Sequence, residues 1–191
     1  MRENKRLYGG LKLICGFLLK VLYRPKVYGV ENIPSSGGII FVSNHKHAFD
    51  PVVVMVHTSR MVHYLAKISL FKGIHGKMLE SIGIIKVDRS KKNPLAVMEA
   101  EEVLNNGGAI GIFPEGTRNR TGEGLLPFKK GAVRMAIETK SLIVPCAIRG
   151  NYRLFRTGLE IEYGKAIDVS NMSTEDANDF VKNEVLNLLG K

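Results

Sequence analysis

The chain has 191 residues, enough for one domain with a full hydrophobic core and too few for two domains of ordinary size. Hydrophobic residues make up 45% and charged residues 24%, which excludes disordered and fibrous classes. The two cysteines cannot form a disulfide framework, so we expect a reducing compartment. The formal net charge of +10 favours an anionic partner, either nucleic acid or a membrane surface.

The basic charge is concentrated at the N-terminus, where residues 1–30 carry seven basic side chains and one acidic one. Residues 7–23 are rich in Leu, Ile, Val, Phe and Tyr, but the longest apolar run, 13–19, is far shorter than the ~20 residues that a bilayer span needs. We therefore predict an amphipathic membrane-interface segment over residues 1–26. The alternative is a helix packed on the protein's own core.

Residues 27–191 form the second predicted unit, in which short apolar runs alternate with segments of helical periodicity. This alternation predicts a single α/β domain with a mixed, mostly parallel central sheet flanked by helices. The predicted strands are 38–42, 62–66, 84–87, 109–113 and 143–148, with a possible edge strand at 161–163. The predicted helices are 51–57, 94–104, 129–139 and 174–189.

A histidine and an aspartate stand five residues apart, directly after the first of these strands. Neighbours on one helix face lie three or four residues apart, so we place His45 in a loop, with Asp50 as the N-cap of a helix that begins at Pro51. The carboxylate can then bind one imidazole nitrogen and leave the other free to take a proton. The pair predicts an enzyme with His45 as general base. The alternative is that Asp50 is simply a helix cap.

Three further strand ends are polar beyond what packing requires: residues 83–89, 113–120 and 144–149. With the first motif they read, in chain order, NHxxxxD, GxIxxxR, FPEGTR and an apolar VP segment. Their order and wording resemble the glycerolipid acyltransferase family, which includes the 1-acyl-glycerol-3-phosphate acyltransferases. The resemblance covers about residues 27–165.

The resemblance implies an O-acyltransferase of phospholipid biosynthesis. An acyl group would pass from acyl-CoA or acyl carrier protein to the sn-2 hydroxyl of lysophosphatidic acid, forming phosphatidic acid. His45 would deprotonate the hydroxyl as it attacks the thioester, and Asp50 would stabilise the imidazolium. Cys146 sits in an apolar strand, where we expect burial to raise its pKa. We therefore predict direct attack without an acyl-enzyme.

An acceptor phosphate needs fixed cations, and the planar fork of arginine can bind two phosphate oxygens at once. The alternative for these polar loops is a set of structural salt bridges. From strand-end geometry and the motif match we assign Arg89, Arg118 and Lys67 to the phosphate, Glu115 to orienting an arginine or a glycerol hydroxyl, Gly116 to close backbone approach, and Thr117 to a hydroxyl contact.

We expect no metal and no cofactor beyond the acyl-CoA or acyl carrier protein co-substrate. The expected partners are anionic membrane lipids and lysophosphatidic acid, with the protein peripheral or monotopic on the cytoplasmic face of the cell membrane, and no nucleic acid. Three alternatives stay open. The acceptor could be another lysophospholipid or glycerol 3-phosphate, the protein could be a metal-dependent phosphoesterase that uses His45, His47 and Asp50 as ligands, or it could be a basic nucleic-acid-binding module.

Overall fold

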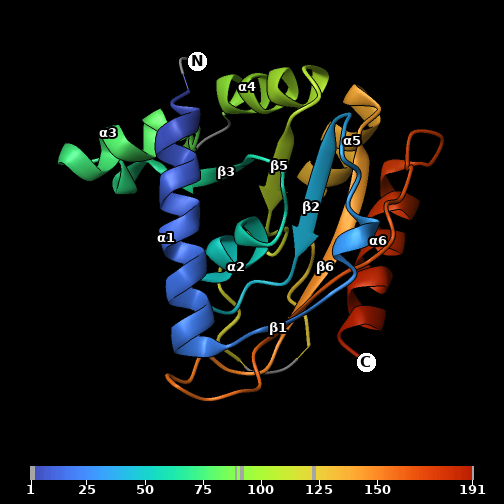
Figure 1. Ribbon diagram of the computed structural model, residues 1–191. Coiled ribbons are helices and arrows are strands. Elements are labelled where there is room, and N and C mark those ends of the chain that lie inside the picture. Colours follow the sequence, from blue (N-terminus) through green and yellow to red (C-terminus); the bar gives the residue numbers. More distant parts are fainter. Residues whose placement is uncertain (1–2, 89, 91–92, 122–123, 191) are drawn as a thin grey trace.

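The computed structural model describes residues 3–88, 90, 93–121 and 124–190. Within these residues, seven strands form one sheet in the order β1-β7-β6-β2-β5-β3-β4. Figure 1 shows β6, β2, β5 and β3 side by side. Strands β2 to β6 are mutually parallel, β7 is antiparallel to β6, and β1 is parallel to β7. The predicted mixed, mostly parallel sheet is confirmed. The strands are β1 Lys26–Tyr28, β2 Ile39–Ser43, β3 Val62–Lys67, β4 Ile85–Val87, β5 Ala109–Ile112, β6 Leu142–Arg149 and β7 Glu160–Tyr163.

Helices cover both faces of the sheet. Side chains alternate along a strand, so Ile40 and Val42 of β2 point to one face while Ile39 and Phe41 point to the other, and all four are buried. The first pair belongs to a core formed with α4, α5 and α6, and the second pair to a core formed with α1 and α2. The helices are α1 Lys5–Tyr23, α2 Asp50–Val56, α3 Gly73–Ser81, α4 Pro94–Asn105, α5 Gly131–Thr139 and α6 Thr174–Leu188.

Helix α1 packs one face against the domain. Tyr8 and Leu19 are buried, and the Tyr8 hydroxyl accepts the Val62 N–H at 2.9 Å. The side chain of Lys12 donates to the Thr58 carbonyl. Among the described residues, no helix is long and apolar enough to cross a membrane. The core-packing alternative is therefore correct for one face of this helix, while its opposite face is exposed.

The parallel strands bring their carboxyl ends to one edge of the sheet. Since β6, β2 and β5 are neighbours, the segments that follow them lie side by side at that edge. β3 lies one strand beyond β5, and β4 is at the end of the sheet. The loops that carry His45, Glu115 and Tyr152 therefore meet at the centre of the carboxyl edge.

Candidate active site

The side chain of Asp50 is fully buried and receives hydrogen bonds on both carboxylate oxygens. Oδ2 accepts from His45 Nδ1 at 2.8 Å and from the main-chain N–H groups of Lys46 and His47 at 2.7 Å each. Oδ1 accepts from the Tyr152 hydroxyl at 2.6 Å. The carboxylate thus binds the loop before it as well as the imidazole ring.

Asp50 is the first residue of α2, and Phe49 is the N-cap without any side-chain capping bond. The prediction of Asp50 as N-cap was therefore wrong by one residue, and its carboxylate does not cap the helix. The prediction that His45 lies in a loop and contacts Asp50 is confirmed. Because the carboxylate accepts from Nδ1, this network assigns the ring proton to Nδ1 and leaves Nε2 as the basic nitrogen.

The His45 ring lies in a stack of aromatic rings. Its centroid is 4.2 Å from that of Phe113, at an interplanar angle of 23°, and Phe113 in turn stacks on Tyr64 at 6.0 Å. The Tyr64 hydroxyl donates to the Pro51 carbonyl at 2.9 Å. Gly111 of β5 makes room for this ring, because a Cβ there would lie 2.1 Å from Tyr64 Cε1. Phe113, directly after β5, and Tyr64 of β3 therefore fix the plane of the imidazole.

Glu115 holds the loops around His45 together. Its buried carboxylate accepts the His45 N–H at 2.7 Å through Oε1 and the Leu126 N–H at 2.9 Å through Oε2. The His45 carbonyl accepts the Asn119 N–H at 2.6 Å. In the described part of the chain, Glu115 bonds to these main-chain amides and to no arginine, while its expected contact with a glycerol hydroxyl stays a prediction.

The other predicted site residues lie around this centre. Gly116 has φ +70, and a Cβ there would lie 2.7 Å from Lys129 Nζ, so the turn requires glycine. Thr117 and Arg118 follow it in the same loop and are exposed. Lys67 is exposed at the carboxyl end of β3, separated from β2 by β5. Arg89 lies outside the described residues.

A cleft of about 620 Å³ opens beside His45. Of the basic side chains that line it, Lys46 donates to the Gly150 carbonyl, and burial lowers the pKa of its ammonium group. Arg149 is paired with Glu160 and Glu162. The residues that line the cleft are Asn44, His45, Lys46, His47, Glu115, Asn119, Arg120, Gly124, Ile148, Arg149, Gly150, Asn151, Tyr152 and Leu189.

Two residues of this centre were not predicted from the sequence. Asn44 is buried and exchanges two hydrogen bonds with the main chain of Ile148, at 2.8 Å and 3.0 Å, which joins the end of β2 to β6. Tyr152 donates to Asp50, and both burial and the charge of that carboxylate raise the pKa of its hydroxyl, which keeps it protonated. Asn44 is the first residue of the NHxxxxD motif, although no role was assigned to it. Tyr152 follows a strand end, which is a weak signal without the topology.

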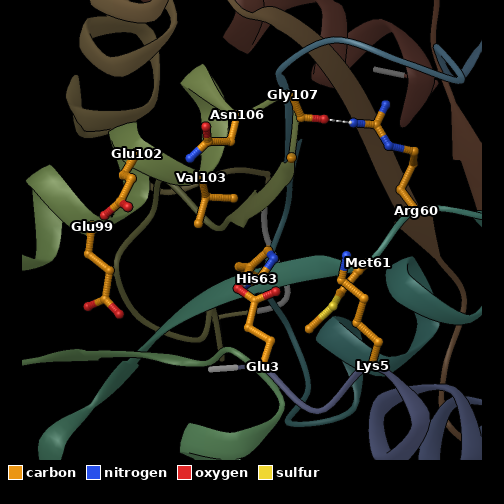
Figure 2. A pocket seen from close by; sticks show the side chains of 11 residues that line it. Glu3, Lys5, Arg60, Met61, His63, Glu99, Glu102, Val103, Asn106 and Gly107 are labelled. Atoms are coloured by element: carbon orange, nitrogen blue, oxygen red, sulfur yellow. Dashed lines mark hydrogen bonds and ion pairs between the residues drawn. The ribbon is translucent and has the colours of Figure 1, made fainter. Parts of the chain in front are cut away.

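A second hollow of about 410 Å³ lies at the opposite edge of the sheet, beside the amino ends of β3 and β5 (Figure 2). Arg60, on its wall, donates to the carbonyls of Pro34, Gly37 and Gly107. His63 is buried and bonds to the Gly83 carbonyl at 2.9 Å. These contacts connect loops of the fold, so we assign this hollow a structural role.

The sequence and the fold were compared with known proteins. A family model described as Acyltransferase matches residues 24–149. Two similar proteins are the 1-acyl-sn-glycerol-3-phosphate acyltransferases of Borreliella burgdorferi, 32% identical over 85% of this chain and 70% of its own, and of Bacillus subtilis, 34% identical over 75% of each. The alpha form of Homo sapiens is 35% identical over 66% of this chain and 47% of its own. The crystal structure of the 1-acyl-sn-glycerophosphate (LPA) acyltransferase of Thermotoga maritima superposes with a TM-score of 0.71 and 24% identity, covering 96% of this chain and 78% of that one.

The contacts of Glu115 predict that its amide variant is destabilised. In Glu115→Gln one carboxylate oxygen becomes an NH₂ group that faces a main-chain N–H, so we expect a loss of about 1–3 kcal/mol in unfolding free energy. Denaturant unfolding measures this loss. The matched control is Glu138→Gln on the exposed side of α5, which we expect to be neutral. Equal stability of the two variants would contradict the conclusion that Glu115 holds the loops around His45 together.

Proposed function

Because this chain belongs to the acyltransferase family, we propose that it transfers a fatty acyl group from a thioester donor to the sn-2 hydroxyl of 1-acyl-sn-glycerol 3-phosphate, forming phosphatidic acid. The chain is thus an enzyme of acyl transfer, and the named relatives support lysophosphatidic acid as acceptor. The donor is acyl-CoA or acyl carrier protein. The product places the reaction in phospholipid biosynthesis.

The observation that carries this proposal is the 2.8 Å bond between His45 Nδ1 and the buried Asp50, at the wall of the cleft. Nε2 of His45 takes the proton of the acceptor hydroxyl while its oxygen attacks the thioester carbonyl. The new C–O bond forms as the C–S bond breaks, and the proton passes from the imidazolium to the leaving thiolate. Asp50 stabilises the imidazolium during this sequence.

Direct attack is favoured because none of the described residues at the pair is an activated nucleophile. Cys146 is buried, and burial raises the pKa of its thiol far above the ordinary value, as the sequence predicted. Ser43 is also buried. The described residues that line the cleft include neither serine nor cysteine. We therefore propose a reaction without an acyl-enzyme intermediate.

For the acceptor phosphate we propose Arg118 and Lys67, exposed near the carboxyl ends of β5 and β3, with Arg89 as a further cation and Thr117 as a hydroxyl donor. No cofactor is required. The phosphoesterase alternative is less well supported, because Asp50 Oδ2 and His45 Nδ1 bond to each other. Among the described residues, no group of three or more His, Cys, Asp or Glu side chains is placed to hold a metal ion.

The reaction predicts a large loss on removal of the base. His45→Ala should lower acyl transfer to lysophosphatidic acid by ~10² to 10⁴, because the base is lost while the substrate contacts remain. Thiol release and lipid product are measured in EDTA, with acyl-CoA and acyl carrier protein as donors. The matched control is His75→Ala on exposed α3, which should keep wild-type activity.

A small effect of His45→Ala on acyl transfer would show that His45 is not the general base. Wild-type product with glycerol 3-phosphate or another lysophospholipid, and none with lysophosphatidic acid, would change the acceptor but keep the reaction class.

We further propose that the protein sits on the cytoplasmic face of the membrane through an apolar surface beside the active site. This surface joins α1 to the loop after β6, where the Phe155 N–H donates to the Leu22 carbonyl at 2.6 Å. Phe155 has φ +57, uncommon for a bulky residue, yet its side chain is 67% exposed. Lys20, Arg24, Arg153 and Arg156 provide positive charge near it. Its exposed apolar members are Leu13, Ile14, Phe17, Leu18, Val21, Leu154 and Phe155.

The membrane surface predicts that Phe17→Ser combined with Phe155→Ser weakens flotation with vesicles containing anionic phospholipid, because two exposed aromatic anchors are lost. Deletion of α1 would be a poorer test, since Tyr8 and Leu19 belong to the core. The matched control is Phe180→Ser on α6, across the sheet, which should float like wild type. Unchanged flotation of the double variant would show that this surface does not bind lipid.

A further inference from the structure

Tyr152 is the least expected member of the active site. It lies in the segment after β6, and its hydroxyl donates to Asp50 Oδ1 at 2.6 Å. The other oxygen, Oδ2, accepts hydrogen bonds from the imidazole and from two main-chain N–H groups. Among the described residues, Tyr152 is the one donor recorded for Oδ1. The two oxygens therefore have different partners. A half-turn of the carboxylate, which would exchange the two oxygens, is thus not equivalent to the observed orientation.

The ring of Tyr152 is fixed by its neighbours. It stacks on His47 with centroids 4.2 Å apart and an interplanar angle of 24°, and it meets Tyr23 at the end of α1 edge-on at 5.6 Å. Phe49 lies 6.4 Å away. Because these rings surround the phenol, the direction of its hydroxyl is set by packing and does not depend on the bond to Asp50 alone.

The main chain around Tyr152 is also anchored. On one side, Lys46 donates to the Gly150 carbonyl. On the other, the Phe155 N–H donates to the Leu22 carbonyl. The segment is thus attached both to the loop that carries His45 and to α1. An anchored segment and a packed ring together hold a hydroxyl against a buried carboxylate, which is the arrangement expected of a residue that orients another.

We propose that Tyr152 is a positioning residue for the His45–Asp50 pair, because its hydroxyl holds Oδ1 and thereby keeps Oδ2 directed at the imidazole. This inference rests on the proposed acyl transfer. Without the hydroxyl, the carboxylate can rotate away from His45, and the negative charge on Asp50 is no longer shared with a donor. The first effect lowers the population of productive geometry, and together the two effects change the negative charge that His45 faces.

The test is Tyr152→Phe, which keeps the ring contacts with His47 and Tyr23 and removes only the hydroxyl. We expect kcat to fall by about 10- to 100-fold, as for loss of a hydrogen bond to a charged group, with little change in KM for donor or acceptor. The acidic limb of the pH profile should shift. The other ionisable groups facing the pair, Lys46, His47 and Glu115, are unchanged in this variant.

The matched control is Tyr163→Phe, which also removes a buried hydroxyl, one that donates to the Val54 carbonyl at 2.7 Å. We expect it to keep kcat and the pH profile. A second measurement does not depend on activity: the titration of the His45 ring, followed by NMR in the free protein, should have a shifted midpoint in Tyr152→Phe and an unchanged one in Tyr163→Phe.

Unchanged kcat and an unchanged His45 titration in Tyr152→Phe would overturn the inference. So would equal losses of activity and stability in the two variants without a titration shift, since that result describes a purely structural tyrosine. Absence of acyl transfer in the wild type, together with the titration shift, would contradict the proposed function while supporting the position of Tyr152.

Discussion

The buried carboxylate of Asp50 is the constraint on which the rest of the site depends. A charged group without access to water is costly unless donors satisfy it, and here four hydrogen bonds meet on two oxygens. Two of the donors are main-chain groups, so the loop after β2 must wrap around the carboxylate. The third is the imidazole itself, and the fourth comes from a different part of the chain. Burial of one charge thus organises the base, its loop and a neighbouring segment.

The sheet supplies the frame that makes this convergence possible. Parallel pairing of β2 with both β5 and β6 places three loops next to one another. Hydrogen bonds then join them pairwise: Asn44 connects the β2 end to Ile148 of β6, and Glu115 after β5 holds the N–H of His45. Stacking on Phe113 fixes the ring that these bonds surround. The base is therefore supported from both neighbouring strands, an arrangement suited to holding a reactive group in one geometry.

The sequence allowed much of this to be predicted, for identifiable reasons. Apolar runs of four to six residues alternating with helical periodicity are local signals, so the parallel strands and most helices were found. β1 was missed because it has only three residues, one of them the charged Lys26. α3 was missed because it begins at Gly73 and leaves Ile74 exposed. The spacing of His45 and Asp50 indicated their contact. That spacing did not reveal that the Asp50 carboxylate bonds to the loop before it and does not cap its own helix.

Contacts that depend on topology were beyond the sequence. Tyr152 and Asp50 are 102 residues apart, and only the adjacency of β6 to β2 brings them together. The sequence placed Glu115 at a strand end. It did not indicate from which main-chain amides its oxygens would accept hydrogen bonds. For helix α1 the core-packing alternative is correct on the buried face, while the membrane contact of its exposed apolar face stays a proposal.

The central claim is that His45 and Asp50 act as a single unit in acyl transfer, and a double-mutant cycle tests it most directly. Acyl transfer is measured for His45→Ala, Asp50→Asn and the combined variant, each confirmed to be folded under the assay conditions. Residues that act as a unit are strongly non-additive, so the combined variant should be about as slow as His45→Ala alone. Losses that multiply in the combined variant would show that the two side chains act independently and would contradict the account.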